Sequence, residues 1–351
     1  MEIKMISPIK ISQGDLWATK TYVHDFVESP DGSKILYRYF PKSDNQPPNL
    51  TDMNHGAQMW MCAADGSNHR MLFEIPLVWR ESGHGSESMV WLDNDRFYYN
   101  GILFSTFENR IVWFLPNPVD ERREISAWSF PARKKLFINI RTGLNAGYYW
   151  IDPYGDNVPE LHPVIGRDEM LTLLGGDSST YQFTYIFLST GGSHLYFVMY
   201  FNNREWGFTS KEDGTDIVPV GNNDMRLKPW NGHTIWFDDD HLVYPCYPEA
   251  VAKYCDRFGN DQTVVGGKSN HITVSPDKKW LVSDSFSVVR LFRYGSTEVV
   301  AELMTDAEKP LPDSKFHTHP SFSRDSKRIY FIGRNGALAA VYCADISSFP
   351  E

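Results

Sequence analysis

The sequence predicts an all-β chain folded as a seven-bladed β-propeller with four-stranded blades. Three observations predict this fold: many aromatic residues, frequent turn residues, and a phrase that recurs along the chain. Aromatic residues make up 15% of the chain, while Gly and Pro number 25 and 21. Aromatic residues favour strands, and Gly and Pro mark the turns between strands. No long stretch repeats its apolar residues with the 3.6-residue period of a helix.

Each copy of the recurring phrase reads as a short strand, a polar turn and a second strand. The clearest copies are HDFVESPDGSKILYRY at 24–39, HITVSPDKKWLVSD at 271–284 and HPSFSRDSKRIYFI at 319–332. Further copies begin at 84 and 233, and weaker copies at 126 and 184. Turns of the Ser-Pro-Asp-Gly type make each copy a β-hairpin.

Between the copies lie segments that turn at Asp-Gly, such as 57–73 and 204–220, and these predict a second hairpin in each unit. Seven units share 351 residues, or about 50 each, which is the period of propeller blades. A single blade cannot bury both of its faces, so blades stack in a ring. A sandwich or two smaller β-domains is the alternative. No interdomain linker is visible, and we expect one domain over residues 1–351.

The N-terminal segment IKISQGDLWATKTYV, residues 9–23, precedes the first repeat. In a propeller, the chain end that precedes the first blade can pair with the last blade. We therefore expect this segment to supply the outer strand that completes the last blade and closes the ring.

Charge and composition argue against several classes of protein. The formal net charge is −10 without a basic tract, so nucleic acid is not an expected partner. No apolar run approaches the ~20 residues of a membrane helix, and the first ten residues lack the apolar core of a signal peptide. Four cysteines without a CxxC pair indicate reduced thiols in a cytoplasmic protein. The sequence makes no prediction about oligomers.

Several histidines stand at or just before the first strand of a repeat. First strands line the central channel of a propeller and run in one direction, so their starts share one end of the channel. His271 and His319 each stand four residues before the serine of their turn, and His317 is two residues from His319. A single histidine at a strand end is more often structural, but three at one opening favour a functional site. His24, His84 and His233 begin other repeats.

These histidine segments resemble a known family, the oligogalacturonate lyases, which are seven-bladed propellers. HTHPSFSRDSKRIYFIGRNGALAAVYCADIS at 317–347 resembles the C-terminal blade of that family, and SNHITVSPDKKWLVSD at 269–284 resembles the blade before it. REWGFTSKEDGTD at 204–216 and GHTIWFDDDHLVYPCY at 232–247 resemble a further family segment. The resemblance covers roughly 200–347 in short motifs, and the N-terminal half matches only as a generic propeller.

The resemblance implies a metal site. The family binds manganese through three histidines and a glutamine, and the histidines correspond to His271, His317 and His319. The cofactor expected is therefore Mn²⁺ or another divalent cation. The glutamine position is Ser314 here, a poor ligand. Water could complete the site, as could Gln262 or Asn270.

The resemblance also implies catalytic residues. The family's base corresponds to His233, and its carboxylate-binding arginine corresponds to Arg204, with Arg226 as the fallback. His84 and Trp236 are further candidates for substrate contact.

The implied reaction is β-elimination from a uronate in an acidic oligosaccharide. The proton on C5 is weakly acidic because the adjacent carboxylate is already negative, and a divalent cation or an arginine on that carboxylate stabilises the enolate-like state. A neutral histidine is a suitable base near pH 7. Two alternatives remain: a lyase for another uronate, of the ulvan or glucuronate type, with little or no metal, and a non-catalytic propeller that binds a glycan or a protein.

Overall fold

The computed structural model describes most of the chain, and the residues that it describes are 3–14, 17–21, 25–40, 57–75, 89–99, 101–115, 128–130, 134–221, 233–247, 249–285, 288–309, 317–336 and 338–349.

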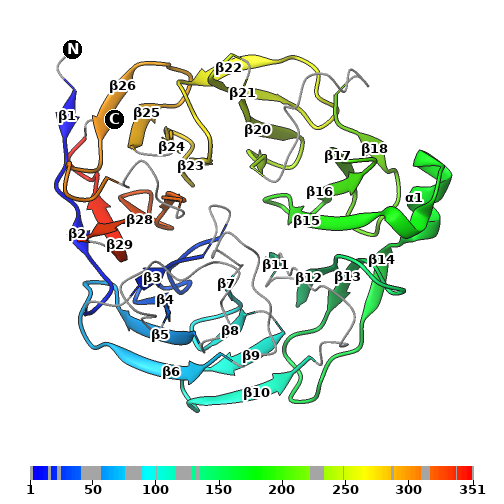
Figure 1. Cartoon of the computed structure of the whole chain (residues 1–351), viewed down its shortest axis with the longest axis horizontal. Helices are drawn as coiled ribbons and strands as arrows, with labels where there is room; N and C mark the ends of the chain where they lie inside the picture. Colours follow the sequence, from blue (N-terminus) through cyan, green and yellow to red (C-terminus); the bar gives the residue numbers. More distant parts are fainter. Residues whose placement is uncertain are drawn as a thin grey trace. The chain divides into compact units, whose positions relative to one another are not determined.

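The described strands form seven sheets, six of four strands and one of five (Figure 1). In each sheet, strands that follow one another in sequence lie side by side, which is the meander of a propeller blade. The first four sheets contain β3 (Trp17–Thr19), β4 (Lys34–Phe40), β5 (Gln58–Ala63) and β6 (Arg70–Glu74); β7 (Met89–Trp91), β8 (Arg96–Tyr99), β9 (Ile102–Ser105) and β10 (Arg110–Phe114); β11 (Trp128–Phe130), β12 (Lys135–Ile140), β13 (Gly147–Ile151) and β14 (His162–Ile165); and β15 (Gln182–Leu188), β16 (His194–Phe201), β17 (Arg204–Lys211) and β18 (Val218–Pro219).

The last three sheets follow the same pattern, and two of them take a strand from the N-terminus. Their strands are β19 (Ile235–Trp236), β20 (His241–Cys246), β21 (Val251–Asp256) and β22 (Thr263–Gly266); β23 (Ile272–Val274), β24 (Trp280–Asp284), β25 (Val289–Arg293), β26 (Val299–Glu302) and β1 (Lys4–Met5); and β27 (Ser321–Phe322), β28 (Arg328–Asn335), β29 (Leu338–Asp345) and β2 (Ile9–Lys10). The predicted fold class, an all-β seven-bladed propeller, is confirmed.

The predicted closure by the N-terminus is also confirmed, and the pairing shows how it is made. Strand β2 pairs antiparallel with β29, with Ile9 opposite Cys343, and so completes the last sheet. Strand β1 pairs parallel with β26 of the sheet before it. The expected segment 9–23 divides, because its residues 17–19 form β3 and belong to the first sheet.

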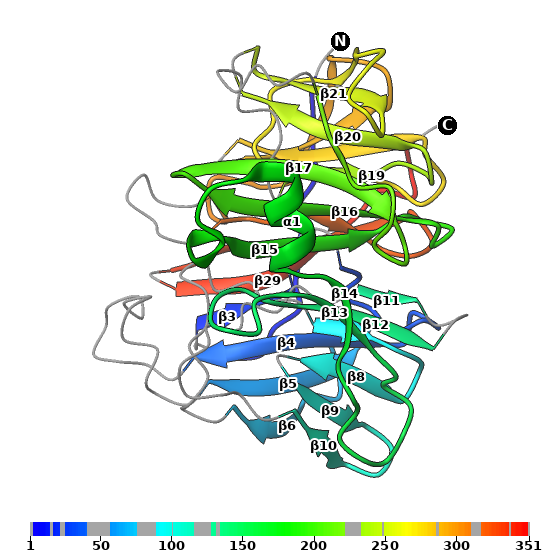
Figure 2. The ribbon, with the colours of Figure 1, turned by 90° about the vertical axis from the view of Figure 1, so that its right-hand side faces the viewer.

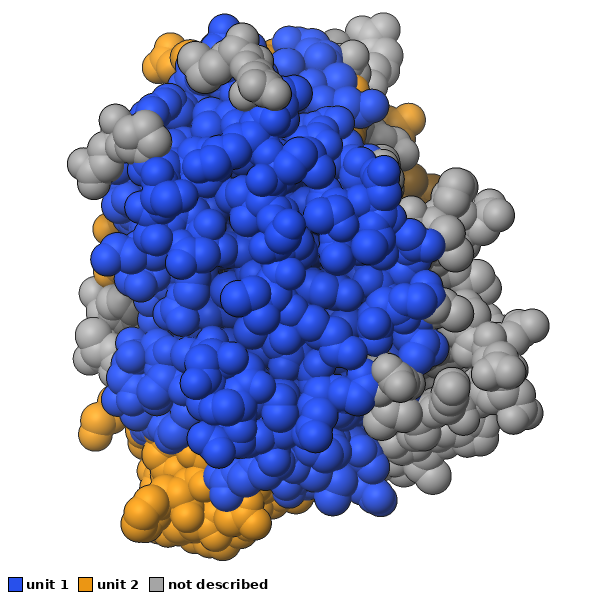
Figure 3. Space-filling model, turned by 90° about the vertical axis from the view of Figure 1, so that its left-hand side faces the viewer, with its two compact units in different colours: residues 1–94, 249–252, 264–351 blue, residues 95–248, 253–263 orange. Residues whose placement is uncertain are grey.

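The chain divides into two compact units, coloured separately in Figure 3. Unit 1 comprises residues 1–94, 249–252 and 264–351, and unit 2 comprises residues 95–248 and 253–263. The single domain expected over residues 1–351 stays a prediction.

Each unit has its own buried apolar clusters. In unit 1, one cluster joins side chains of β24, β25, β28 and β29, and includes Leu291 and Phe331. In unit 2, the aromatic and aliphatic side chains of β15 and β16 pack with Met170 of α1 (Arg167–Leu174). Figure 2 shows this helix beside the β15–β17 strands. A 3₁₀ turn, η2 (Ser178–Thr180), follows it. No described helix is long and apolar enough to cross a membrane.

The recurring turn has the same hydrogen bonds in the copies at Ser29, Ser275 and Ser323. Each serine hydroxyl donates to the carboxylate of the aspartate two residues later at 2.6 Å. Each also accepts the backbone N–H of the residue five positions later. The residue three positions after the serine takes a positive φ in all three of these copies: Gly32, Lys278 and Ser326. These contacts explain why the phrase requires serine and aspartate at fixed spacing.

The four cysteines are buried and form no disulfide. They are Cys62, Cys246, Cys255 and Cys343. Burial raises the pKa of the Cys62 and Cys343 thiols to about 12. Buried protonated thiols pack as small apolar side chains, which agrees with the reduced thiols predicted from their spacing.

Candidate metal centre

Three histidine side chains meet in unit 1, as the sequence predicts. One nitrogen of each ring, from His271, His317 and His319, lies within 4.8 Å of the others. The ring centroids of His271 and His319 are 4.4 Å apart, and that of His317 lies 5.2 and 5.4 Å from them. His271 and His319 are each 1% exposed, whereas His317 is half-buried. The cluster therefore has a buried side and an accessible side.

Neighbouring hairpins bring these histidines together. His271 immediately precedes β23, and the other two precede β27. The Thr273 hydroxyl on β23 donates to the Pro320 carbonyl at 2.9 Å, so the starts of the two strands are held side by side. His271 and His319, each four residues before its turn serine, therefore lie next to each other.

Asp284, the last residue of β24, links the two halves of the cluster. Its carboxylate oxygens lie 2.9 and 3.1 Å from His271 Nδ1, and one of them accepts the His271 backbone N–H at 3.0 Å. The Thr318 hydroxyl, between the other two histidines, donates to Oδ2 at 2.6 Å. One buried carboxylate therefore fixes the positions of both histidine segments. Neither Asp284 nor Thr318 was predicted from the sequence.

The charge state of Asp284 determines which nitrogen of His271 can bind a ligand. Burial raises the pKa of this carboxyl, but the charge of His271 and the hydrogen bonds from His271 and Thr318 outweigh burial and lower the pKa to about 2. When the ring is neutral, as a metal ligand must be, the ionised carboxylate accepts the Nδ1 proton and Nε2 keeps a lone pair. A carboxylate behind a histidine is the usual support of a metal-binding imidazole.

The backbone at His319 is strained. Its φ is +41°, in the left-handed region that residues other than glycine rarely adopt. The segment is held in place by the Ile332 N–H, which donates to the Thr318 carbonyl at 2.7 Å. Strain of this kind costs of the order of 1 kcal/mol and persists where the surroundings fix the conformation, as at ligand sites.

Unit 1 also contains a buried lysine. Lys20 follows β3 and is fully buried. Burial lowers the pKa of Lys20 to about 7, while the carboxylates of Asp25 and Asp284 favour its charged form. No role for Lys20 or Asp25 was predicted from the sequence.

The donor set fits a divalent transition-metal ion. Three imidazoles converge, one has a supporting carboxylate, and one faces the accessible side. Imidazole suits zinc, copper, iron and nickel, and imidazole mixed with oxygen ligands also suits manganese. The group of His271, His317 and His319 could therefore hold such a cation. Asn270, a suggested fourth ligand, lies with its Nδ2 3.1 Å from His271 Nδ1.

The predicted catalytic residues that the structure describes belong to unit 2. His233 precedes β19, and its Nδ1 is hydrogen-bonded to the Tyr247 hydroxyl at 2.5 Å. Arg204 begins β17 and is exposed. Trp236 donates from its indole N–H to the Phe187 carbonyl at 3.0 Å. Gln262, also in unit 2, donates to the Gly259 carbonyl at 3.2 Å.

Three positions named by the sequence analysis, His84, Arg226 and Ser314, lie outside the described residues. The catalytic and substrate-binding roles of His233, Arg204, Arg226, His84 and Trp236 stay predictions.

Fold and site together define a β-propeller with a three-histidine site. No family model matches the sequence. No curated protein matches it either.

Solved structures do match. Oligogalacturonate lyase from Vibrio parahaemolyticus aligns with a TM-score of 0.65 at 12% identity, over 97% of this chain and 93% of that one. Oligogalacturonate lyase in complex with manganese aligns at 0.62 and 14% identity, with the same coverage. A puromycin-hydrolysing peptidase of Mycobacterium tuberculosis aligns at 0.58 and 12% identity, over 94% of this chain and 56% of that one. At these identities the similarity establishes the propeller fold.

Proposed function

We propose that this protein is a metal-dependent lyase that cleaves uronate-containing acidic oligosaccharides by β-elimination. The observation that carries the proposal is the convergence of His271, His317 and His319, with Asp284 bonded to His271 and Thr318. Structural similarity to oligogalacturonate lyases, one of them bound to manganese, supports the same class of reaction. Mn²⁺ is the proposed cation, and the proposed location is the cytoplasm.

In the proposed reaction, a base removes the C5 proton of the uronate. The electron pair of that C–H bond forms the C4–C5 double bond, the bond from C4 to the bridging oxygen breaks, and this oxygen takes up a proton from the protonated base or from water. The cation held by the three histidines supplies positive charge that stabilises negative charge at the carboxylate. Stabilisation of this charge is the larger requirement, because general-base catalysis contributes typically 10²–10⁴-fold.

His233 is the proposed base and Arg204 the proposed partner of the substrate carboxylate. For Nε2 of His233 to take a proton, Nδ1 must carry its own proton and donate it to the Tyr247 oxygen. Arg204 is exposed, so its guanidinium is accessible to a dissolved substrate. A guanidinium binds a carboxylate through two parallel hydrogen bonds.

The test is a screen of acidic oligosaccharides that contain galacturonate, glucuronate or ulvan-type uronates. Chelator-treated protein is assayed with and without added Mn²⁺, and the unsaturated product is followed by its ultraviolet absorbance. We expect product only when Mn²⁺ is present. Product without any metal would favour a metal-independent uronate lyase, and metal binding without product from any substrate would contradict the lyase and favour a binding protein.

Variants separate the proposed roles. His319→Ala should lose both Mn²⁺ binding and elimination, whereas His233→Ala should lose elimination and keep Mn²⁺. Arg204→Ala should chiefly weaken substrate binding. His162→Ala is the matched control, because His162 stacks on Trp150 at 4.0 Å in unit 2 and has no proposed role in the reaction. Full activity of His233→Ala would show that another group is the base.

A further inference from the structure

The three histidines of the candidate metal centre come from two adjacent sheets of unit 1. His271 leads into the β23–β26 sheet, whereas His317 and His319 lead into the β27–β29 sheet. We call the contact between these two sheets the seam. A cation held by all three rings would bridge the seam at its inner strands. Because metal–ligand distances in proteins vary by only about 0.2 Å, the affinity of such a site depends on how the two sheets are held against each other.

The outer strands of the same two sheets are joined by residues 4–10, which we call the strap. Its strand β1 pairs with β26, and the Ile6 N–H extends this pairing with a bond to the Glu302 carbonyl at 3.0 Å. Its strand β2 pairs with β29, so the strap runs from one sheet to the other (Figure 1). Residues 6–8 separate the two strands. Three residues span at most about 11 Å, so the strap limits how far the outer strands can separate.

Side chains of the strap also pack across the seam. Ile6 packs against the buried cluster that includes Trp280 of the β23–β26 sheet and Phe331 of the β27–β29 sheet. The Lys4 ammonium lies 4.5 Å from the centre of the Phe349 ring, and this ring meets Trp280 edge-on with centroids 6.2 Å apart. The strap therefore holds both sheets on the outside of the seam, while the histidines face each other on the inside.

The strap is also the part of the seam that opens most easily. Strand β1 has two residues, and Met5 is 51% exposed. A short, exposed strand opens locally at a small fraction of the free energy of global unfolding. When β1 leaves β26, the seam keeps inner contacts such as the bond from Thr273 to Pro320 at 2.9 Å, but the restraint on its outer strands is lost. The strap thus has a closed state, with β1 paired, and an open state.

We propose that the strap regulates the metal centre: its closed state favours binding of a divalent cation by the three histidines, and the bound cation favours the closed state. The inference rests on the metal centre of the proposed function and adds a conformational control to it. Both effects express one coupling free energy, so they have the same magnitude. We expect a factor of about five, the lower end of the usual range for coupled sites.

The first experiment measures Mn²⁺ affinity by isothermal titration calorimetry, without substrate. Removal of residues 2–6 deletes β1, and we expect it to weaken Mn²⁺ binding about fivefold. Insertion of Gly-Ser-Gly-Ser-Gly-Ser between Ser7 and Pro8 keeps both strands but lengthens their connection, and it should weaken binding in the same direction by a smaller factor. The same insertion between Gln13 and Gly14 is the matched control. It lies between β2 and β3, outside the seam, and should leave the affinity unchanged.

The second experiment measures the reciprocal effect on the wild-type protein. Amide hydrogen exchange of the strap is followed by mass spectrometry with and without saturating Mn²⁺. The Ile6 N–H exchanges when its bond to the Glu302 carbonyl opens, so we expect Mn²⁺ to slow its exchange by the same factor of about five. Strand β6 is the control, because it is the outer strand of another sheet in unit 1, and its exchange should not change.

The outcomes separate this inference from the proposed function. Mn²⁺ binding that the strap variants leave unchanged, or exchange that Mn²⁺ does not slow, overturns the inference and leaves the metal centre in place. Equal weakening by the control insertion would show general destabilisation and also overturn it. If a strap variant does not fold, which circular dichroism would show, exchange in the wild type decides the question. A wild type that binds no Mn²⁺ overturns the metal centre and this inference with it.

Discussion

At the residue scale, Asp284 determines how the candidate site is organised. Replacing it with asparagine keeps the shape but removes the charge, and an amide oxygen is a weaker acceptor for His271 Nδ1. We expect Asp284→Asn to weaken Mn²⁺ binding by about 10–100-fold, the range for a lost supporting carboxylate. Calorimetry checks this, with exposed Asp306→Asn as the control. Unchanged affinity would show that the histidines need no support from this carboxylate.

The same carboxylate predicts an acid-dependent loss of stability. Its pKa in the folded protein is about 2, below the ordinary value of 3.8, so Asp284 binds protons more weakly when folded than when unfolded. Its stabilising contribution is therefore complete above about pH 4 and is lost as the pH falls toward about 2. We expect the difference in unfolding free energy between wild type and Asp284→Asn to shrink over this window in urea titrations. A difference independent of pH would contradict the ionised, hydrogen-bonded state.

The sequence was sufficient to group the three histidines but not to identify the residues that support them. His271 and His319 occupy the same position relative to a turn serine, so the repeat itself predicts that they meet. Asp284 lies on the second strand of its hairpin, and its contact with His271 depends on strand register. Thr318 reaches the same carboxylate from the neighbouring sheet, and no local pattern encodes that contact.

At the element scale, the recurring turn explains why the fold could be predicted at all. Serine and aspartate at fixed spacing form the same hydrogen bonds in the copies at Ser29, Ser275 and Ser323.

The position of the inner strand of the first sheet was predicted less accurately. The phrase predicts a strand from residue 24, whereas β3 ends at Thr19, and Glu28 forms only an isolated bridge with Ile35. The polar side chains of Lys20, Thr21 and Asp25 turn into the interior between these two points.

The turn also predicts opposite effects for two substitutions at equivalent positions. Gly32 has φ +69° and Lys278 has φ +62°. A Cβ at Gly32 would meet no atom closer than 3.9 Å, so Gly32→Ala carries mainly the backbone cost, about 1 kcal/mol of destabilisation. Lys278→Gly removes the same cost but adds unfolded-state entropy, so we expect a gain of about 0.5 kcal/mol. Urea midpoints measure both, and shifts of the same sign would contradict this account of the turn.

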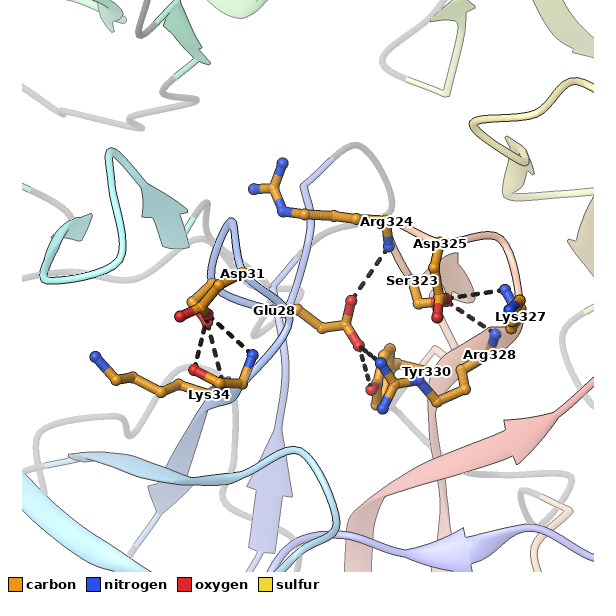
Figure 4. Close-up of polar contacts among 11 residues, drawn as sticks. Glu28, Asp31, Lys34, Ser323, Arg324, Asp325, Lys327, Arg328 and Tyr330 are labelled. Atoms are coloured by element: carbon orange, nitrogen blue, oxygen red, sulfur yellow. Dashed lines mark hydrogen bonds and ion pairs between the residues drawn. The ribbon is translucent and has the colours of Figure 1, made fainter.

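At the scale of the whole molecule, the two ends of the chain are joined by more than the pairing of β2 with β29. Figure 4 shows the buried carboxylate of Glu28 among residues of the last sheet. It accepts from the Tyr330 hydroxyl at 2.7 Å, pairs with Arg328 at 2.8 Å, and accepts the Arg324 N–H at 3.2 Å. Glu28 and Tyr330 are 302 residues apart, so these bonds form only when the N-terminal and C-terminal segments are assembled. A glutamate in the first repeat gives no sequence signal of such a partner.

Glu28→Gln should therefore weaken this junction specifically. The charged hydrogen bonds to Arg328 and Tyr330 become neutral ones, and a donor amide is placed where three donors converge, so we expect a loss of about 1–3 kcal/mol in unfolding free energy. Tyr330→Phe removes one of the same bonds, and the double variant should cost less than the sum of the two single changes, because both act on one network. Additive costs would mean that Glu28 stabilises the chain without Tyr330. Glu28 bonds to Arg324, Arg328 and Tyr330, whereas Asp284 bonds directly to His271, so both variants should weaken Mn²⁺ binding less than Asp284→Asn does.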